Sequence, residues 1–232
     1  MSLQVADRLG WADAMTLVNT GIGVLALAAA VLGEVRLVAQ LVLLAAVADG
    51  LDGVIARRFG STRVGPYLDS MADIVSFGTA PAAFVFVLAS EEWHDTGLTL
   101  SADPGPVAVA AVVAAGFVVF SLVRTALYTV YVGENETRPG IQNTLASSIL
   151  VVAYLAGLTA VPAVLAGTVV LSVLMLAPVP YPKLLDRDAL VLGVVQMGAI
   201  LTPTALERLF PRALLLCALA YLLLAPRFYW AD

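Results

Sequence analysis

The chain has 232 residues, of which 61% are hydrophobic and 12% are charged, and its formal net charge is -5. Soluble domains average about 25% charged residues, so this composition excludes an ordinary soluble protein, and the acidic balance excludes a basic nucleic-acid-binding surface. A mean hydropathy of +0.96 instead predicts an integral membrane protein.

Apolar runs long enough to cross about 30 Å of hydrocarbon recur along the whole chain. We expect eight membrane-spanning helices, at approximately 14–32, 36–57, 66–89, 106–132, 144–159, 162–177, 189–203 and 211–226. The fifth and sixth are short, with a tight break at Pro162. The start, MSLQVADRLGWAD, does not predict a cleavable signal peptide, because it lacks a basic region followed by an apolar stretch.

Three interruptions rich in proline, glycine or polar residues divide the chain: SADPGPV (101–107), GENETRPG (133–140) and APVPYPKLLDRD (177–188). The last separates six spans that carry unusual polar residues from two spans that carry almost none. We therefore expect a core over residues 1–186 and an accessory transmembrane hairpin over residues 187–232, within one membrane domain.

Loop charges predict the orientation, since cytoplasmic loops are enriched in Lys and Arg. With eight spans, one set of loops holds Arg8, Arg57, Arg58, Arg63, Arg138, Lys183, Arg187 and Arg227, and the other holds only Arg36, Arg208 and Arg212. We therefore place both termini and the loop at 57–65 in the cytoplasm.

Four aspartates gather in the second and third spans. Asp49 and Asp52 are three residues apart, and Asp69 and Asp73 are four apart, so each pair lies on one face of its helix. The short loop at 57–65 makes the two helices antiparallel neighbours, which brings the four carboxylates together at the cytoplasmic end. Four solvated helix ends are the simpler interpretation, but they do not account for the small residues interleaved with the aspartates.

Carboxylates crowded in a low dielectric repel one another unless cations neutralise them. Oxygen ligands suit Mg²⁺ or Mn²⁺, and two such ions form the usual clamp on a phosphoryl group. Gly53 and Ala56 are small enough for a ligand to approach the backbone. Arg57 would supply a cationic contact to phosphate.

The stretch Asp49-x-x-Asp52-Gly53-x-x-Ala56-Arg57, followed by Gly65-x-x-x-Asp69-x-x-x-Asp73, resembles the signature of the CDP-alcohol phosphotransferases, with every signature position filled. The resemblance implies an all-α integral membrane enzyme with a six-helix core, commonly a homodimer. Such an enzyme transfers the phosphatidyl group of a CDP-linked lipid to an alcohol and releases CMP.

The resemblance also implies roles for individual residues. Two metal ions would be held by Asp49, Asp52, Asp69 and Asp73, and Asp73 would be the general base on the acceptor hydroxyl. The CDP group would be bound by Asp52, Gly53, Ala56, Arg57 and Gly65.

Over roughly residues 12–184 the chain resembles one branch of the family, the phosphatidylserine and archaetidylserine synthases. The segments are MTLVNTGIG (15–23), LDSMADIVSFGTAPA (68–82), VRTALYTVY (123–131) and PVPYPKL (178–184). The first implies that Thr16 and Asn19 face the nucleotide. The chain departs from the branch at RPGIQNTLASS (138–148), in lacking Arg-Phe-Asn after the fourth helix, and at Asp13, where asparagine is common.

Arg124 lies within a span, where an arginine is costly and faces the interior or a polar cavity. It could pair with a helix-end carbonyl or an aspartate, or its fork could bind the carboxylate of the acceptor. Arg138, Tyr181 and Lys183 are expected on the same side and could contribute to acceptor binding. Snorkelling of their side chains explains them about as well.

The leading hypothesis is transfer from a CDP-activated lipid to L-serine at the cell membrane, with the active site facing the cytoplasm. Eleven arginines against one lysine, with a pI of about 4.8, are typical of a salt-loving source and favour CDP-archaeol over CDP-diacylglycerol. Glycerol phosphate or inositol phosphate remains open as the acceptor. A divalent-cation transporter is the alternative from another class, but its carboxylates are expected at mid-membrane on broken helices.

Overall fold

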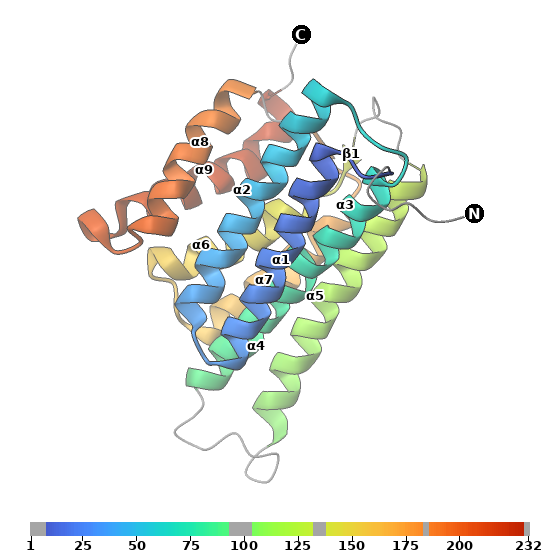
Figure 1. The fold of residues 1–232 in the computed structure, drawn as a ribbon. Coiled ribbons are helices and arrows are strands. Elements are labelled where there is room, and N and C mark those ends of the chain that lie inside the picture. Colours follow the sequence, from blue (N-terminus) through green and yellow to red (C-terminus); the bar gives the residue numbers. More distant parts are fainter. Residues whose placement is uncertain (1–7, 93–103, 132–137, 183–185, 230–232) are drawn as a thin grey trace.

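The computed structural model describes residues 8–92, 104–131, 138–182 and 186–229. These residues form a bundle of helices with one short two-stranded sheet (Figure 1). In chain order the elements are α1 (Trp11–Val31), α2 (Val35–Phe59), α3 (Gly65–Asp73), the π-helical turn η2 (Ile74–Thr79), α4 (Ala80–Glu92), α5 (Pro104–Tyr131), β1 (Arg138–Pro139), α6 (Asn143–Ala156), α7 (Val161–Met175), β2 (Pro180–Tyr181), α8 (Asp186–Leu201) and α9 (Ala205–Phe228). The expected all-α membrane fold is confirmed.

Five helical segments are long and apolar enough to cross a membrane: Trp11–Val31, Val35–Phe59, Gly65–Glu92, Gly105–Tyr131 and Ala205–Phe228. The third is a continuous rod made of α3, η2 and α4. Asn143–Ala156, Val161–Met175 and Leu190–Leu201 are apolar but shorter. Each of the eight expected spans therefore corresponds to a helical segment. At about 1.5 Å per residue, the shorter three fall below the roughly 30 Å of hydrocarbon.

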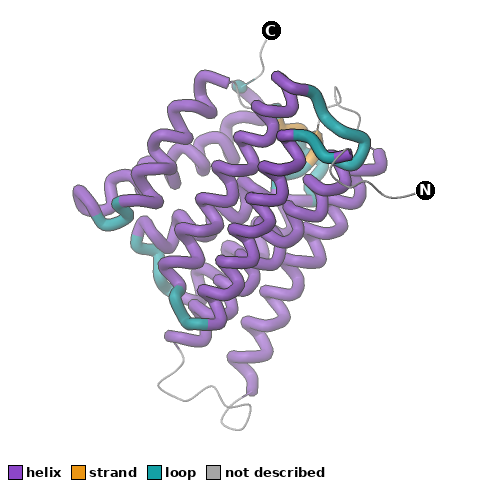
Figure 2. Tube along the Cα trace, viewed as in Figure 1, coloured by secondary structure: helices purple, strands orange, loops and turns teal. Residues whose placement is uncertain are grey.

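The helices run along a common axis, and most connections gather at the two ends of the bundle (Figure 2). α1 begins, α2 ends, α3 begins and α9 ends at the same end (Figure 1). Small buried side chains such as Ala26, Ala29 and Ala39 let α1 and α2 approach closely, which is how membrane helices gain packing contacts without a hydrophobic driving force.

The π-helical turn η2 directly follows Asp73, and it packs against α1. Ser76 Oγ donates a hydrogen bond to the Asn19 carbonyl oxygen at 3.1 Å. A Cβ added to Gly23 would lie 2.5 Å from Ser76 Oγ, so α1 needs a residue without a side chain there. π turns inside helices are frequent at functional sites, and this one lies between the aspartate-bearing α3 and α4.

The two-stranded sheet joins the α5–α6 connection to the α7–α8 connection. β1 and β2 pair antiparallel, with Arg138 opposite Tyr181. Gly140 follows β1 with a φ of 79° and donates its N–H to the Val179 carbonyl at 2.8 Å. A Cβ there would lie 2.1 Å from the Met175 carbonyl oxygen, so only glycine fits.

The last two helices pack against the rest of the bundle through polar contacts as well as apolar ones. Gln40 Nε2 of α2 donates to the Ile200 carbonyl at 2.6 Å, and Gln196 Nε2 of α8 donates to the Leu43 carbonyl at 2.7 Å. α9 in turn packs on α6. A domain division at residue 186 stays a prediction.

Candidate active site

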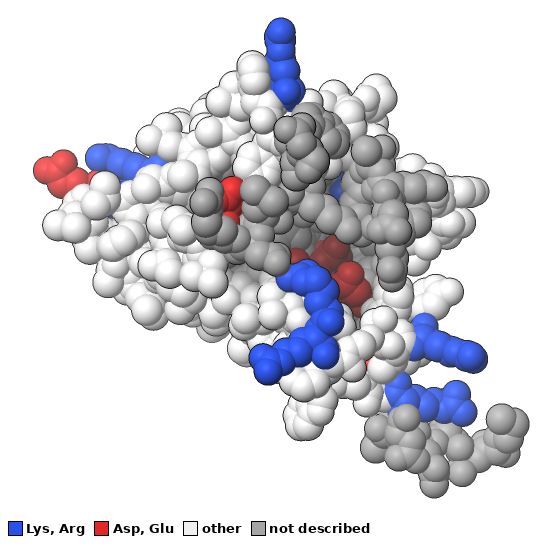
Figure 3. All heavy atoms as spheres, turned by 90° about the horizontal axis from the view of Figure 1, so that it is seen from above, with Lys and Arg blue, Asp and Glu red and all other residues white. Residues whose placement is uncertain are grey.

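A cavity of about 710 Å³ opens at the end of the bundle where α2 ends and α3 begins. Its walls come from α1, α2, α3, α5 and the loop between α2 and α3. When the molecule is viewed from this end, acidic side chains lie in a hollow of the surface and basic side chains lie beside the hollow (Figure 3). Of the residues predicted for the site, those that line the cavity are Thr16, Asp52, Gly53, Ala56, Arg57, Gly65, Asp69, Asp73 and Arg124.

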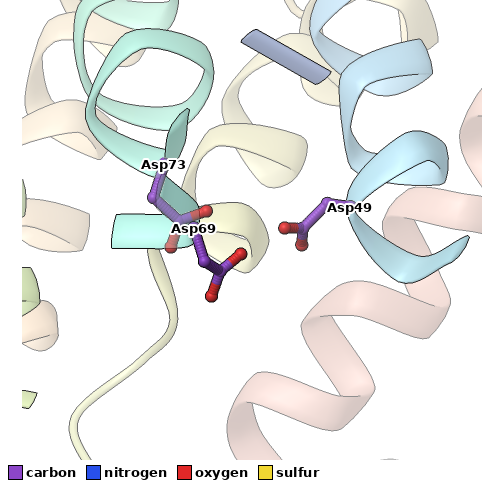
Figure 4. A group of neighbouring side chains, drawn as sticks. All are labelled: Asp49, Asp69 and Asp73. Atoms are coloured by element: carbon purple, nitrogen blue, oxygen red, sulfur yellow. The ribbon is translucent and has the colours of Figure 1, made fainter. Parts of the chain in front are cut away.

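Three carboxylates converge beside this cavity. Asp49 comes from α2, and Asp69 and Asp73 come from successive turns of α3, pointing toward Asp49 (Figure 4). One oxygen from each lies within 4.8 Å of the others. Within the described part of the chain, Asp73 Oδ1 is buried without a hydrogen-bond partner. The Thr144 hydroxyl of α6 approaches Asp49 Oδ2 at 3.4 Å.

Asp52, the fourth predicted metal ligand, lies next to this group but is not part of it. Its Oδ2 accepts a hydrogen bond from Thr16 Oγ1 at 2.9 Å, and the residue is only 8% exposed. Its charge acts on both Asp49 and Asp69. Thr16 thus joins α1 to Asp52 of α2, next to the aspartate cluster.

The donor set fits a hard divalent cation. Opposite ligand oxygens around Mg²⁺ are about 4.2 Å apart, twice the metal–oxygen distance, so Asp49, Asp69 and Asp73 need only small side-chain movements to share one ion. The bare Oδ1 of Asp73 also lacks any other partner among the described residues. This cluster could therefore hold a divalent metal ion.

Small residues and one arginine shape the wall formed by α2. A Cβ added to Gly53 would lie 3.6 Å from Arg57 Nη1, which places the guanidinium over the glycine. Ala56 lines the same wall. An anionic ligand could therefore approach the helix backbone and meet Arg57 at the same time.

Asp13 is a cavity residue for which no role was predicted. It is 2% exposed, and its Oδ2 accepts hydrogen bonds from the Gly10 N–H at 2.7 Å and Thr62 Oγ1 at 2.8 Å. Thr62 Oγ1 in turn accepts from the Gly65 N–H at 3.0 Å. This chain of bonds ties the start of α1 to the loop before α3. The one feature of the sequence that pointed to Asp13 was that the branch of the family that the chain resembles commonly has asparagine at this position.

Arg124 lies on the wall formed by α5, 6% exposed. Its guanidinium carbon is 4.1 Å from the centre of the Tyr128 ring, a cation–π contact. The charge of Arg124 acts on Asp73. A cation thus lies near the predicted general base, on a different helix.

Two polar residues beside Arg124 were not singled out from the sequence. Asn143, at the start of α6 and 1% exposed, donates from Nδ2 to Thr125 Oγ1 at 2.7 Å. In the described residues, Asn143 Oδ1 and Ser121 Oγ are buried without hydrogen-bond partners. Nothing in the sequence showed that α6 would bring an asparagine to α5, because the two are neighbours only in the folded bundle.

The remaining predicted residues do not reach the cavity or cannot be placed. Asn19 is fully buried and lies outside the cavity lining, and neither of its amide atoms has a partner in the part of the chain described. Tyr181 donates its hydroxyl to the Leu222 carbonyl at 3.0 Å. The backbone of Arg138 pairs with Tyr181, but its side chain lies outside the description, as does all of Lys183. Their roles in acceptor binding stay predictions.

Comparison with known proteins agrees with this geometry. The chain is 25% identical over 183 residues to the archaetidylserine synthase of Methanothermobacter thermautotrophicus, covering 78% of this chain and 72% of that one. It is 40% identical over 91 residues to the inner membrane protein YnjF of Escherichia coli, covering 39% and 43%. A CDP-diacylglycerol–serine O-phosphatidyltransferase of Mycobacterium tuberculosis is 36% identical over 82 residues, covering 35% and 29%.

The profile of one family, described as CDP-alcohol phosphatidyltransferase, matches residues 9–178. This stretch includes the whole cavity wall and all four aspartates. The chain is therefore an enzyme of the CDP-alcohol phosphatidyltransferase family.

Proposed function

We propose that the protein transfers the phosphatidyl-type group of a CDP-activated lipid to the hydroxyl of L-serine, releasing CMP. The observation that supports this most directly is the cluster of Asp49, Asp69 and Asp73 beside a cavity that Arg124 also lines. Family membership supports transfer to an alcohol. The names of the archaeal and mycobacterial relatives favour serine as that alcohol.

The CDP group would lie along α2, with Gly53 and Ala56 leaving room at the backbone and Arg57 meeting a phosphate. Thr16 keeps Asp52 directed toward the cavity wall. Asn19, Gly65 and Asp52 complete the set proposed for nucleotide binding. Two Mg²⁺ or Mn²⁺ ions held by Asp49, Asp52, Asp69 and Asp73 would supply Lewis-acid stabilisation of the phosphoryl oxygens.

Asp73 would take the proton of the serine hydroxyl as the serine oxygen bonds to the lipid-linked phosphorus. The bond from that phosphorus to the oxygen of CMP breaks, and CMP leaves with the electron pair. Arg124 would bind the serine carboxylate in its fork, orienting the hydroxyl toward Asp73. The hydrogen bond from Asn143 fixes Thr125 on the wall next to Arg124.

The membrane setting is also proposed. Arg57, Arg58 and Arg63 lie at the aspartate end of α2 and in the loop after it, which supports an active site facing the cytoplasm at the cell membrane. The archaeal relative and the acidic, arginine-rich composition favour CDP-archaeol over CDP-diacylglycerol. The assembly is proposed to be a homodimer by family resemblance.

The test is CMP release by purified protein given a CDP-lipid, Mn²⁺ or Mg²⁺, and one acceptor at a time: L-serine, glycerol phosphate or inositol phosphate. We expect release with L-serine and its loss in Asp73→Asn. Release only with a phosphorylated polyol would overturn the acceptor and keep the chemistry. No release with any acceptor, in a protein that binds Mn²⁺, would favour cation transport.

The role of Arg124 has its own readout. L-Serine methyl ester lacks the carboxylate, so it should be a poorer acceptor than L-serine for the unmodified protein. In Arg124→Gln the two acceptors should become nearly equal, with a higher KM for L-serine. If Arg124→Gln prefers L-serine over the methyl ester as strongly as the unmodified protein does, Arg124 does not bind the acceptor carboxylate.

A further inference from the structure

A second, smaller cavity lies at the other end of the bundle. It has a volume of about 50 Å³ and is lined by Arg36, Tyr154, Leu155, Thr159, Pro203, Thr204 and Arg208. Arg36 is in the first turn of α2, sixteen residues before Asp52, which separates it from the site by about 24 Å at 1.5 Å per residue. This cavity is therefore distinct from the aspartate site.

Two guanidinium groups face the same small space. Arg36 is exposed and Arg208 is partly buried. Both charges act on the Tyr154 hydroxyl, as does the Glu91 carboxylate. Glu92, next to it, accepts the Val161 N–H at the start of α7 at 3.2 Å. Two guanidinium groups and the Glu91 carboxylate thus lie around the Tyr154 hydroxyl.

The backbone that carries Arg208 is unusual. Leu206, Glu207 and Arg208 all have left-handed φ values, of 47°, 54° and 66°. Residues with a Cβ rarely adopt this region, and several in a row are found where the surroundings or a function require them. Here the left-handed turn directs the Arg208 side chain back toward the end of α6.

Gly157, which ends α6, makes room for this arginine. Its φ is 113°, and a Cβ added there would lie 2.8 Å from Arg208 Nη1. The Arg208 guanidinium thus contacts Gly157, and it lines the same cavity as Tyr154. The left-handed turn and the glycine together present a planar fork of donors to the cavity.

We propose that this cavity binds a phosphate group. Arginine forks suit phosphate oxygens, and the hydroxyls of Tyr154, Thr159 and Thr204 are further donors in the lining. Its volume suits a group of about two water-sized units and is too small for a nucleotide. The cavity lies at an end of membrane-spanning helices, within reach of phospholipid headgroups, so a headgroup or free phosphate could supply the ligand.

The test uses the full chain in neutral detergent, with short-chain phosphatidylglycerol added and bound lipid measured by native mass spectrometry. Removing each guanidinium should weaken the site roughly tenfold, because a hydrogen bond to a charged group is worth about one decade in affinity or more. We expect Arg36→Gln and the double variant Arg36→Gln/Arg208→Gln to weaken lipid binding progressively. Arg212→Gln, an exposed arginine one turn beyond Arg208 and outside the lining, is the matched control and should bind as the unmodified protein does.

Arg36→Gln leaves the left-handed turn untouched, so it keeps the test valid if the double variant folds poorly. Equal binding by Arg36→Gln and the unmodified protein would overturn the proposal, as would an equal loss in Arg212→Gln. Competition by sodium phosphate, against sodium chloride at matched ionic strength, would support a site for phosphate from either source. Lipid binding that phosphate does not displace would support the headgroup alone. CMP release by the same variants reports on the aspartate site separately.

Discussion

The aspartate cavity and the α8–α9 hairpin hold polar side chains in opposite ways. Asp73 of the cavity lining, and Asn19, Ser121 and Asn143 on helices that pack with its walls, keep buried polar atoms without hydrogen-bond partners among the described residues. In the hairpin contacts, Gln40, Gln196, Tyr181 and Tyr221 each donate to a backbone carbonyl of a neighbouring element. Both regions belong to the same bundle of helices.

This contrast distinguishes a ligand-binding site from a contact that only holds helices together. A buried polar atom without a partner destabilises the fold, most of all where water is excluded. Such atoms are expected where a ligand supplies the missing partner, and one of them, Asp73 Oδ1, belongs to the carboxylate cluster. The satisfied donors of the hairpin hold helices together and need no ligand. Substitutions in the two regions should therefore affect different properties.

The largest expected effect is on activity, from Asp69→Asn. Removing one carboxylate from the cluster weakens cation binding and the stabilisation of the phosphoryl oxygens, which is worth several kcal/mol, or at least about 100-fold in rate. CMP release measured against Mn²⁺ concentration checks this. Glu207→Gln removes the same charge from an exposed position at the other end and should leave the rate unchanged. Equal rates of CMP release for Asp69→Asn and Glu207→Gln would show that the aspartate cluster has no part in the reaction.

The next effect is on stability, from Gly140→Ala. The new Cβ would meet the Met175 carbonyl oxygen at a backbone conformation that disfavours alanine, so we expect a loss of more than about 2 kcal/mol. Thermal unfolding in detergent measures it. Gly167→Ala is the control, because its Cβ would meet nothing within 4 Å in the middle of α7. It should be neutral or stabilising by up to about 1 kcal/mol.

A substitution between α1 and η2 should affect both properties. In Gly23→Ala the Cβ would press on Ser76, with a distance of 3.0 Å to its Cα, and overpacking of this kind destabilises by about 1–3 kcal/mol. Because Ser76 is one turn beyond Asp73, CMP release should fall as well. Gly21→Ala, where the Cβ meets nothing within 4 Å, should change neither. Full activity in a destabilised Gly23→Ala would show that η2 does not position Asp73.

The smallest effect is expected from Gln40→Leu and Gln196→Leu. Each removes one hydrogen bond between α2 and α8, worth about 0.6–2 kcal/mol inside a membrane. Thermal unfolding should detect the loss, and CMP release at a temperature where both variants are folded should be nearly unchanged. A fall in CMP release comparable to that of Asp69→Asn would mean that the hairpin takes part in the site, and the comparison drawn above would be wrong.

Local patterns predicted most of the helices and the core of the site. The period of about 3.6 residues placed Asp49 beside Asp52 and Asp69 beside Asp73 on shared helix faces, and the short loop at 57–65 made their helices neighbours. The structure brings Asp49, Asp69 and Asp73 together and leaves Asp52 bonded to Thr16. That last distinction depends on where α1 packs, which spacing along α2 does not reveal.

Contacts between distant segments could not be predicted in this way. The pairing of Arg138 with Tyr181 and the hydrogen bond from the Tyr181 hydroxyl to Leu222 of α9 join segments far apart in the chain. The bonds from Asp13 to Thr62 and from Asn143 to Thr125 also join different helices or loops. Each depends on how whole helices lie against one another.

Hydropathy and helical spacing are local properties of the chain, so they were enough to predict a helical membrane protein with clustered carboxylates at one end. The packing of the helices was needed to show which polar groups line the cavity, which ones join helices, and that Arg36 and Arg208 share a pocket at the far end. In a membrane, apolar faces pack on one another or on lipid with little preference. Helix positions therefore depend on small residues, glycines and polar contacts whose partners lie far away in the sequence.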